Sequence, residues 1–254
     1  ESGVHPLKMS EILTKDEQAQ ILDKELLYGY TNGTPQLRKS VIDIYDKELS
    51  LDNVLITSGS AEANFLSIMT QLDRGDEIVY MIPNYLQIYH LARSLGIEVK
   101  TLPIRQELGW QWDPNELKKI VSSNTKMIVI CNPNNPTGAI MDGQIMDKVI
   151  EIAEKNDCWI LSDEVYRGAE LNGVECRSFV GATEKTIVNA GLSKAYSLPG
   201  LRIGWTIGSK EYIEKAWSFH DFTVINVSYL SDWIASRILT DERRIKILNR
   251  TKDH

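Results

Sequence analysis

The sequence predicts an α/β protein of three layers, with a mostly parallel central sheet between layers of helices. Short apolar or β-branched runs alternate along the chain with longer amphipathic stretches, a pattern typical of βαβ units. The 254 residues are 43% apolar and 25% charged, so the chain can bury a large core. Neither an internal repeat nor a low-complexity linker is visible, which favours one large domain, or one domain plus a fragment.

The apolar runs predict seven strands, at residues 54–57, 77–82, 99–104, 127–131, 159–162, 186–189 and 203–207. The amphipathic stretches predict helices at 35–45, 61–72, 87–95, 114–121, 142–155 and 210–217, followed by one long helix from 228 to about 249. In open α/β sheets, ligands bind at the carboxyl ends of the strands. We therefore expect the functional groups to follow the strands.

Charge and hydropathy exclude several classes of partner. The formal net charge of −7 is spread along the chain, and basic residues cluster only in short pairs such as Lys118-Lys119 and Arg243-Arg244. This disfavours nucleic acid and anionic membranes as partners. No segment approaches the ~20 apolar residues of a membrane span, and the N-terminus lacks a signal-peptide pattern. We expect a cytoplasmic protein.

The cysteines and histidines show no pattern of metal binding. Cys131, Cys158 and Cys176 are odd in number and lack metal-like spacing, so we expect reduced thiols in or near the core. The four histidines, at positions 5, 90, 220 and 254, are scattered and form no ligand pair. No metal site is predicted.

The most informative segment is GLSKAYSLPGLRIG, residues 191–204. It sets Lys194 among small residues and places Arg202 eight positions later. A lysine with small neighbours can reach a carbonyl carbon to form a Schiff base, and a fixed guanidinium nearby can hold a phosphate on the same ligand. Alone, a lysine in such a loop would be an ordinary surface residue. The interpretation therefore depends on the motifs that accompany it.

Four further motifs follow predicted strands or begin predicted helices. Ser58-Gly59-Ser60 follows a strand and precedes a helix near Ala61, where free amides and the helix dipole attract an anion. The segments PNY (83–85), NPNNPTG (132–138) and DEVY (163–166) each follow a strand. Taken singly, these motifs could be a serine cap, a core aromatic, a proline-stiffened turn and a carboxylate helix cap.

In this order, the motifs resemble those of class I and II aminotransferases, pyridoxal-phosphate (PLP) enzymes of fold type I that include aspartate aminotransferase. The resemblance runs from about Tyr28 to the last helix. It implies that Lys194 binds the cofactor as a Schiff base and that Asp163 pairs with the pyridine nitrogen. A carboxylate there keeps the ring protonated, so that the ring can accept carbanion electrons.

The resemblance also implies roles for the remaining motif residues. Asn135 and Tyr166 would bond the phenolic oxygen of the cofactor, and Tyr85 would stack on its ring. The predicted phosphate-binding residues are Gly59, Ser60, Ala61 and Arg202.

The segment YGYTNGTPQLR, residues 28–38, is similar to a segment of the family in which the first tyrosine reaches the phosphate in the neighbouring subunit. Tyr28 is the matching residue, which implies a homodimer with composite sites. Pro35 at the first turn of the following helix fits its ordinary structural preference as well.

The resemblance divides the chain into an N-terminal segment, 1–27, and a PLP-binding large domain, 28–254, that ends in a long linker helix. The family's small C-terminal domain, with its substrate-carboxylate arginine, is expected to be absent, which implies a fragment, a truncation or missing density. Gly191 stands where many relatives have a serine that contacts the phosphate. The opening residues 1–5 have no firm counterpart.

The function implied by the resemblance is transamination between an amino acid and a 2-oxo acid. Lys194 would move the proton between the substrate and the cofactor. Elimination, decarboxylation and cyclisation stay open, because the same residues serve all of these PLP reactions. A different alternative is a cofactor-binding but inactive fragment.

Overall fold

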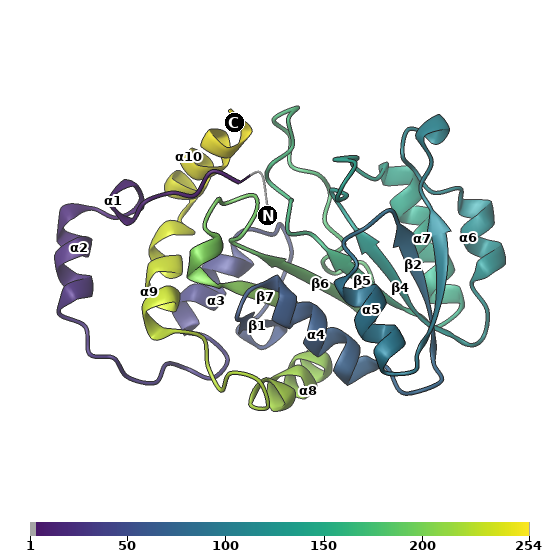
Figure 1. Ribbon diagram of the computed structural model, residues 1–254, viewed down its shortest axis with the longest axis horizontal. Coiled ribbons are helices and arrows are strands. Elements are labelled where there is room, and N and C mark those ends of the chain that lie inside the picture. Colours follow the sequence, from purple (N-terminus) through teal and green to yellow (C-terminus); the bar gives the residue numbers. More distant parts are fainter. Residues whose placement is uncertain (1–3, 254) are drawn as a thin grey trace.

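The computed structural model describes residues 4–253 and confirms the predicted three-layer α/β architecture (Figure 1). His254 and the first three of the five unmatched opening residues lie outside the described residues. The sheet has seven strands in the order β1-β7-β6-β5-β4-β2-β3. Each strand lies within two residues of its prediction: β1 Val54–Thr57, β2 Glu77–Ile82, β3 Glu98–Pro103, β4 Thr125–Cys131, β5 Trp159–Asp163, β6 Thr186–Gly191 and β7 Gly204–Ile207.

The sheet is parallel except at one strand. Strands β2 to β6 pair in parallel, whereas β7 runs antiparallel to both of its neighbours, β6 and β1. The carboxyl ends of β1, β2, β4, β5 and β6 therefore lie at the same edge as the amino end of β7. This edge collects the predicted motifs.

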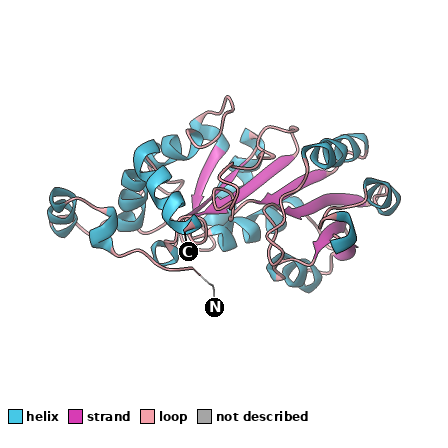
Figure 2. Cartoon of the chain, turned by 90° about the horizontal axis from the view of Figure 1, so that it is seen from above, coloured by secondary structure: helices cyan, strands magenta, loops and turns pink. Residues whose placement is uncertain are grey.

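Helices cover both faces of the sheet (Figure 2). One face packs against α4 (Ser60–Gln71), α5 (Gln87–Ser94) and α8 (Lys210–His220). The other packs against α3 (Pro35–Ile42), α6 (Pro114–Ile120), α7 (Gly143–Lys155), α9 (Tyr229–Ile238) and α10 (Asp241–Lys252). Neighbouring strand residues alternate between the two cores, as Ile187 and Val188 do on β6, because strand side chains alternate between faces.

The prediction of one long helix at 228–249 is wrong. The segment forms α9 and α10, and Thr240 between them has extended backbone (φ −83°, ψ 150°). Asp241 and Glu242 then occupy the first turn of α10, where acidic side chains are favourable. Threonine followed by two acidic residues is a helix-start signal that the amphipathic pattern concealed.

Two short helices precede α3: α1 (Met9–Ile12) and α2 (Lys15–Leu22). Helix α2 lies at one end of the molecule and buries none of its residues (Figures 1 and 2). Its first turn is capped by Thr14, and Glu17 forms an ion pair with Arg243 of α10 at 3.0 Å.

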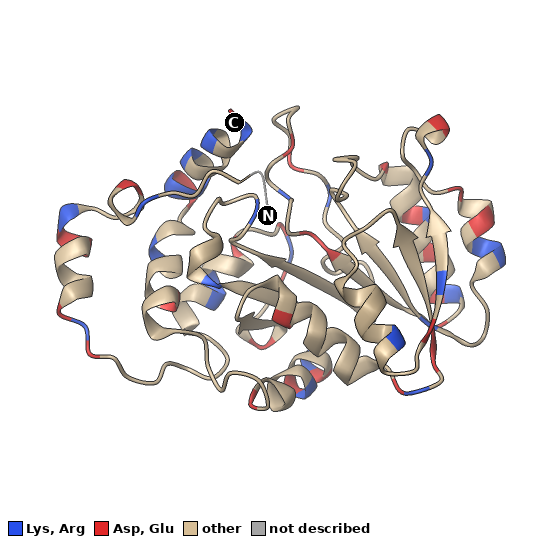
Figure 3. Ribbon diagram, viewed as in Figure 1, with Lys and Arg blue, Asp and Glu red and all other residues tan. Residues whose placement is uncertain are grey.

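Charged residues of both signs lie on the outer helices (Figure 3).

Cys131, Cys158 and Cys176 are buried thiols, as predicted. Within residues 4–253, no helix combines the length and apolar character needed to cross a membrane.

Candidate active site

A cavity of about 830 Å³ opens at the edge of the sheet where the motifs meet. Eight of the ten predicted site residues line it: Ser60, Ala61, Tyr85, Asn135, Asp163, Tyr166, Lys194 and Arg202. They lie in the first turn of α4 after β1, at the end of β5, and in the segments that follow β2, β4, β5 and β6. The structure therefore brings these residues together at the edge of the sheet where the strands were expected to present them, and their roles stay predictions.

Gly59 shapes one side of the cavity without lining it. It precedes α4 with φ +79°, which favours glycine, and a Cβ there would lie 2.2 Å from Arg202 Nη2. The helix begins at Ser60, and no side chain caps it, so the serine-cap interpretation is wrong. The amides at this helix start stay available to an anion.

Arg202 approaches the same helix start. Its guanidinium donates to Ser193 Oγ at 3.2 Å and to the carbonyl oxygen of Pro199 at 3.1 Å. Gly204 makes this approach possible, because a Cβ there would lie 2.4 Å from the backbone of Gly59 and Ser60. The arginine and the helix dipole together give this end of the cavity a positive potential.

Gly191, the departure from the family's serine, also lies in a crowded position. A Cβ there would be 3.0 Å from the carbonyl oxygen of Ile203 and 3.1 Å from Gly204 Cα. A larger residue would need the β6 and β7 ends to separate by a few tenths of an ångström. Glycine at 191 therefore fits the close pairing of these strand ends.

Asp163 supplies a carboxylate at the end of β5. It is 8% exposed, and it accepts hydrogen bonds from Asn64 Nδ2 at 3.0 Å and from the Val165 amide at 3.2 Å. Burial raises the pKa of this carboxyl, and the two hydrogen bonds oppose that rise. Among residues 4–253, no cation forms an ion pair with it, so it can accept a cationic ligand group.

The loop after β4 brings one of its three asparagines to the cavity. Asn132 accepts from the Met141 amide at 2.9 Å, and Asn134 donates to the Pro83 carbonyl oxygen at 3.1 Å. These two buried side chains fix the loop, whereas Asn135 lines the cavity. The predicted choice of Asn135 matches this arrangement.

Two tyrosines line the cavity beside Asn135. Burial, with the nearby Cys131 and Asp163, raises the pKa of Tyr166, so its hydroxyl keeps its proton and can donate it to an acceptor. Tyr85 lines the cavity and is 57% exposed.

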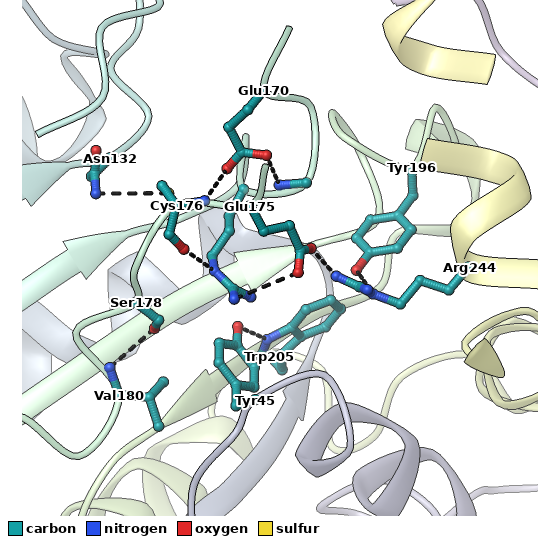
Figure 4. Close-up of polar contacts among 12 residues, drawn as sticks. Tyr45, Asn132, Glu170, Glu175, Cys176, Ser178, Val180, Tyr196, Trp205 and Arg244 are labelled. Carbon is teal, nitrogen blue, oxygen red and sulfur yellow. Dashed lines mark hydrogen bonds and ion pairs between the residues drawn. The ribbon is translucent and has the colours of Figure 1, made fainter. Parts of the chain in front are cut away.

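The loop that carries Lys194, residues 192–203, is contacted through Tyr196 by a cluster of polar and aromatic side chains (Figure 4). We call this loop the lysine loop. Arg244 on α10 donates to Tyr196 Oη at 3.1 Å and forms an ion pair with Glu175. Tyr196 packs edge-on against Trp205, which in turn donates to Tyr45 Oη at 3.1 Å. Helix α10 is thereby tied to the loop that carries Lys194.

Several cavity residues were not predicted from the sequence: Val4, His5, Asn64, Gln87, Cys131, Val165, Ala169, Ser193, Ser197, Pro199 and Thr251. Asn64 could have been found, because it lies four residues after Ser60 and so shares its helix face. Thr251 lies in α10 and bonds Ser197 Oγ at 2.9 Å, a contact between segments far apart in sequence. No local pattern indicates such a contact.

Tyr28 lies outside the cavity lining and is 80% exposed. The expected contact of Tyr28 with another subunit stays a prediction.

Comparisons with known proteins agree with the motifs. The family described as aminotransferase class I and II matches residues 4–253. The aspartate aminotransferase of Pyrococcus horikoshii is 31% identical over 94% of this chain, which spans 62% of that relative's length.

Solved structures show the same fold. A PLP-dependent aminotransferase from Streptococcus suis superposes with a TM-score of 0.90 and 33% identity, over 97% of this chain and 66% of that one. A double mutant of Thermus thermophilus aspartate aminotransferase superposes with a TM-score of 0.92 at 23% identity, over 99% of this chain and 67% of that one. With a family match over almost its whole length, this chain belongs to the class I and II aminotransferases.

Proposed function

We propose that this chain is the PLP-binding part of an aminotransferase that moves an amino group between an amino acid and a 2-oxo acid. The observation that supports this most directly is that Lys194 and the buried Asp163 face one cavity, together with Arg202. An amine, a buried carboxylate and a guanidinium are the three charged groups that PLP requires.

The polar groups of the cavity fit PLP. Arg202 and the free amides after Gly59 offer positive potential to the phosphate. Asp163 offers negative charge to a protonated ring nitrogen. Asn135 and Tyr166 can donate to the phenolic oxygen, and the exposed aromatic side chain of Tyr85 suits a flat ring.

In the proposed mechanism, Lys194 would hold the cofactor until the amino group of the substrate replaces it there, and the freed Lys194 amine would then move protons. The bound cofactor supplies a sink for the electron pair left on the substrate Cα when its proton departs. We assign Lys194 Nζ the removal of that proton. Asp163 would keep the ring nitrogen protonated, and Arg202 would hold the phosphate.

We further propose a homodimer in which Tyr28 completes the neighbouring site, in the cytoplasm. The segments around Tyr28 and Ile225 meet, because Gly29 lies beside Asn226 and Tyr229. Together they expose large apolar side chains: Leu26, Leu27, Tyr28, Tyr30, Phe222 and Ile225. Such a patch supports burial against a second copy. Light scattering coupled to size exclusion would measure the mass, and a monomer at micromolar concentration would contradict this proposal.

The test is an absorbance spectrum of the purified chain with added PLP, followed by titration with glutamate, aspartate and alanine. A visible band that converts to a near-ultraviolet form with an amino acid supports transamination. Release of 2-oxo acid without an acceptor would indicate elimination instead. A visible band that stays unchanged with every amino acid would indicate a chain that binds the cofactor but does not catalyse transamination.

Replacement of the lysine gives the decisive comparison. Lys194→Ala should abolish both the visible band and turnover, because no other amine would form the covalent bond. Lys210→Ala, at an exposed lysine on α8, is the matched control and should behave like the wild type. Turnover retained in Lys194→Ala would refute the assignment.

A further inference from the structure

We propose that a buried hydrogen-bonded relay orients Asp163 toward the cofactor, with Asn64 and Asn189 as positioning residues. The inference rests on the proposed function, in which Asp163 faces the cofactor ring. The relay joins side chains from two helices and two strands: Asn64 and Ser67 of α4, Asn189 of β6, Thr206 of β7 and Tyr212 of α8.

The contacts of the relay are continuous. Asn64 Nδ2 lies 3.0 Å from Asp163 Oδ2, and Asn189 Nδ2 lies 2.9 Å from Asn64 Oδ1. Asn189 Nδ2 is also 3.0 Å from Ser67 Oγ. Tyr212 Oη lies 2.9 Å from Ser67 Oγ and 2.8 Å from Thr206 Oγ1. Every distance is that of a normal hydrogen bond.

All five relay side chains are inaccessible to solvent, with exposures between 0% and 2%. They lie within the apolar layer that contains Leu66, Ile187 and Ile213. Polar groups in such a layer are costly unless they bond one another, and apolar side chains would fill the same space. Packing alone therefore does not explain the relay.

The direction of each bond follows from the ionised Asp163, which can only accept. Asn64 must turn Nδ2 toward the carboxylate, so its Oδ1 faces Asn189. Asn189 must then present Nδ2, which donates to both Asn64 and Ser67. Because the amide orientations interlock, a flip of either asparagine would set two oxygens against each other.

The hydroxyl groups fix the orientation of Asn189 from its other side. Ser67 Oγ donates to the Ala63 carbonyl oxygen at 2.8 Å, so it accepts from Asn189 and from Tyr212. Thr206 then donates to Tyr212. Because the Ser67 proton is already donated to Ala63, Ser67 can only accept from Asn189, and this holds Asn189 Nδ2 toward Ser67 and Asn64. The relay thus fixes Asn64 as a donor, and it holds one oxygen of Asp163 while the carboxylate keeps acceptor capacity toward the cavity.

Asn64 lines the cavity, whereas Asn189, Ser67 and Tyr212 are not among its lining residues. The side chain of Asn189 therefore reaches the Asp163 carboxylate through Asn64 and not through the cavity. Loss of Asn189 would free the Asn64 amide to rotate, and burial would then raise the pKa of Asp163 further. The other titratable groups that face Asp163 are Tyr80 on β2, Cys131 on β4, Tyr166 after β5 and, across the cavity, His5, Tyr85, Lys194 and Arg202.

The relay can be tested by PLP binding, without measuring turnover. Dissociation constants would be taken from the visible band of the Lys194 adduct between pH 5 and 9, for wild type, Asn189→Ala and Ser67→Ala. The matched control is Thr70→Val, since Thr70 is a buried hydroxyl residue on the same helix that bonds only its neighbours Leu66 and Gln71.

We expect Asn189→Ala to weaken PLP binding about tenfold, as for a lost hydrogen bond to a charged group, and to move the acidic limb of the binding curve toward neutral pH. Ser67→Ala should also weaken PLP binding and shift the acidic limb toward neutral pH, each by a smaller amount. This variant tests the relay if Asn189→Ala does not fold. In an Asp163→Asn background, the shift of the acidic limb caused by Asn189→Ala should vanish, because the titrating group is gone.

Two results would overturn the relay. One is that both relay variants bind PLP like Thr70→Val at every pH. The other is that their effects persist unchanged in the Asp163→Asn background. A wild-type chain that forms no visible band would instead overturn the proposed function, and with it the relay's role.

Discussion

Glu164 provides a stability prediction that is independent of the cofactor. It follows Asp163 directly and is 1% exposed. Its Oε1 accepts from the Phe179 amide at 2.9 Å and from Ser162 Oγ at 3.2 Å, whereas its Oε2 has no partner among the described residues. Burial raises the pKa of this carboxyl from 4.5 to about 7. We predict that Glu164→Gln makes the chain more stable at alkaline pH.

The sign and size follow from proton linkage. Between pH 4.5 and about 7 the folded chain holds a proton on Glu164 that the unfolded chain has released, so stability falls as the pH rises. At about 1.36 kcal/mol per pH unit, the full loss is about 3 kcal/mol and is complete above the folded pKa. Glutamine stays neutral. The new amide at the Oε2 position adds a cost that does not vary with pH.

The assay is urea unfolding of wild type and Glu164→Gln at pH 5 and pH 8.5. The difference in free energy of unfolding should move in favour of the variant by about 2.5 kcal/mol between the two conditions, because part of the full loss has already occurred at pH 5. Contributions from other titrating groups cancel in this difference. Glu214→Gln, at an exposed position on α8, is the control. A difference that is equal at both pH values would refute the reasoning.

Two further predictions concern the anion-binding end of the cavity. Gly204→Ala should destabilise the fold by roughly 1–3 kcal/mol and weaken PLP binding, because its Cβ would meet the backbone of Gly59 and Ser60 at 2.4 Å. Gly200→Ala, where a Cβ meets nothing within 4 Å, is the control in thermal melts, and equal melting temperatures would contradict the prediction. Glu62 is bonded by His220, Thr223 and the Ser58 amide, and these bonds outweigh burial to lower its pKa. Its contribution is therefore present above pH 4.5 and lost as the pH falls through the lower folded pKa, so acid titrations of stability should show a shallower fall for Glu62→Gln.

The strands and motif loops could be predicted because their signals are local. A buried parallel strand is an apolar run of fixed length, and the groups that follow it must lie at one sheet edge. That reasoning predicts Asp163, Asn135 and Lys194 at one edge of the sheet. The break at Thr240 also has a local signal, the helix start, but the amphipathic pattern continues on both sides of it and conceals that signal.

The relay and the support of the lysine loop could not be predicted, because their signals are distant in sequence. Asn64 and Asn189 are 125 residues apart, and each alone is an ordinary polar residue in an apolar run. Thr251 reaches the cavity only because α10 folds back over the lysine loop, where Arg244 bonds Tyr196. Such contacts depend on how whole helices and strands pack against one another, and a local sequence pattern does not determine that packing.

The reversal of β7 explains why Lys194 and Arg202 can be close in sequence and still line one cavity. Gly191 at the end of β6 pairs with Gly204 at the start of β7, so the intervening loop leaves and re-enters the sheet at the same edge. A parallel β7 would begin at the opposite edge, about 13 Å away for a four-residue strand. Arg202 would then be separated from the α4 helix start. The spacing of eight residues is thus a consequence of the antiparallel strand, and the two glycines allow the close approach that it requires.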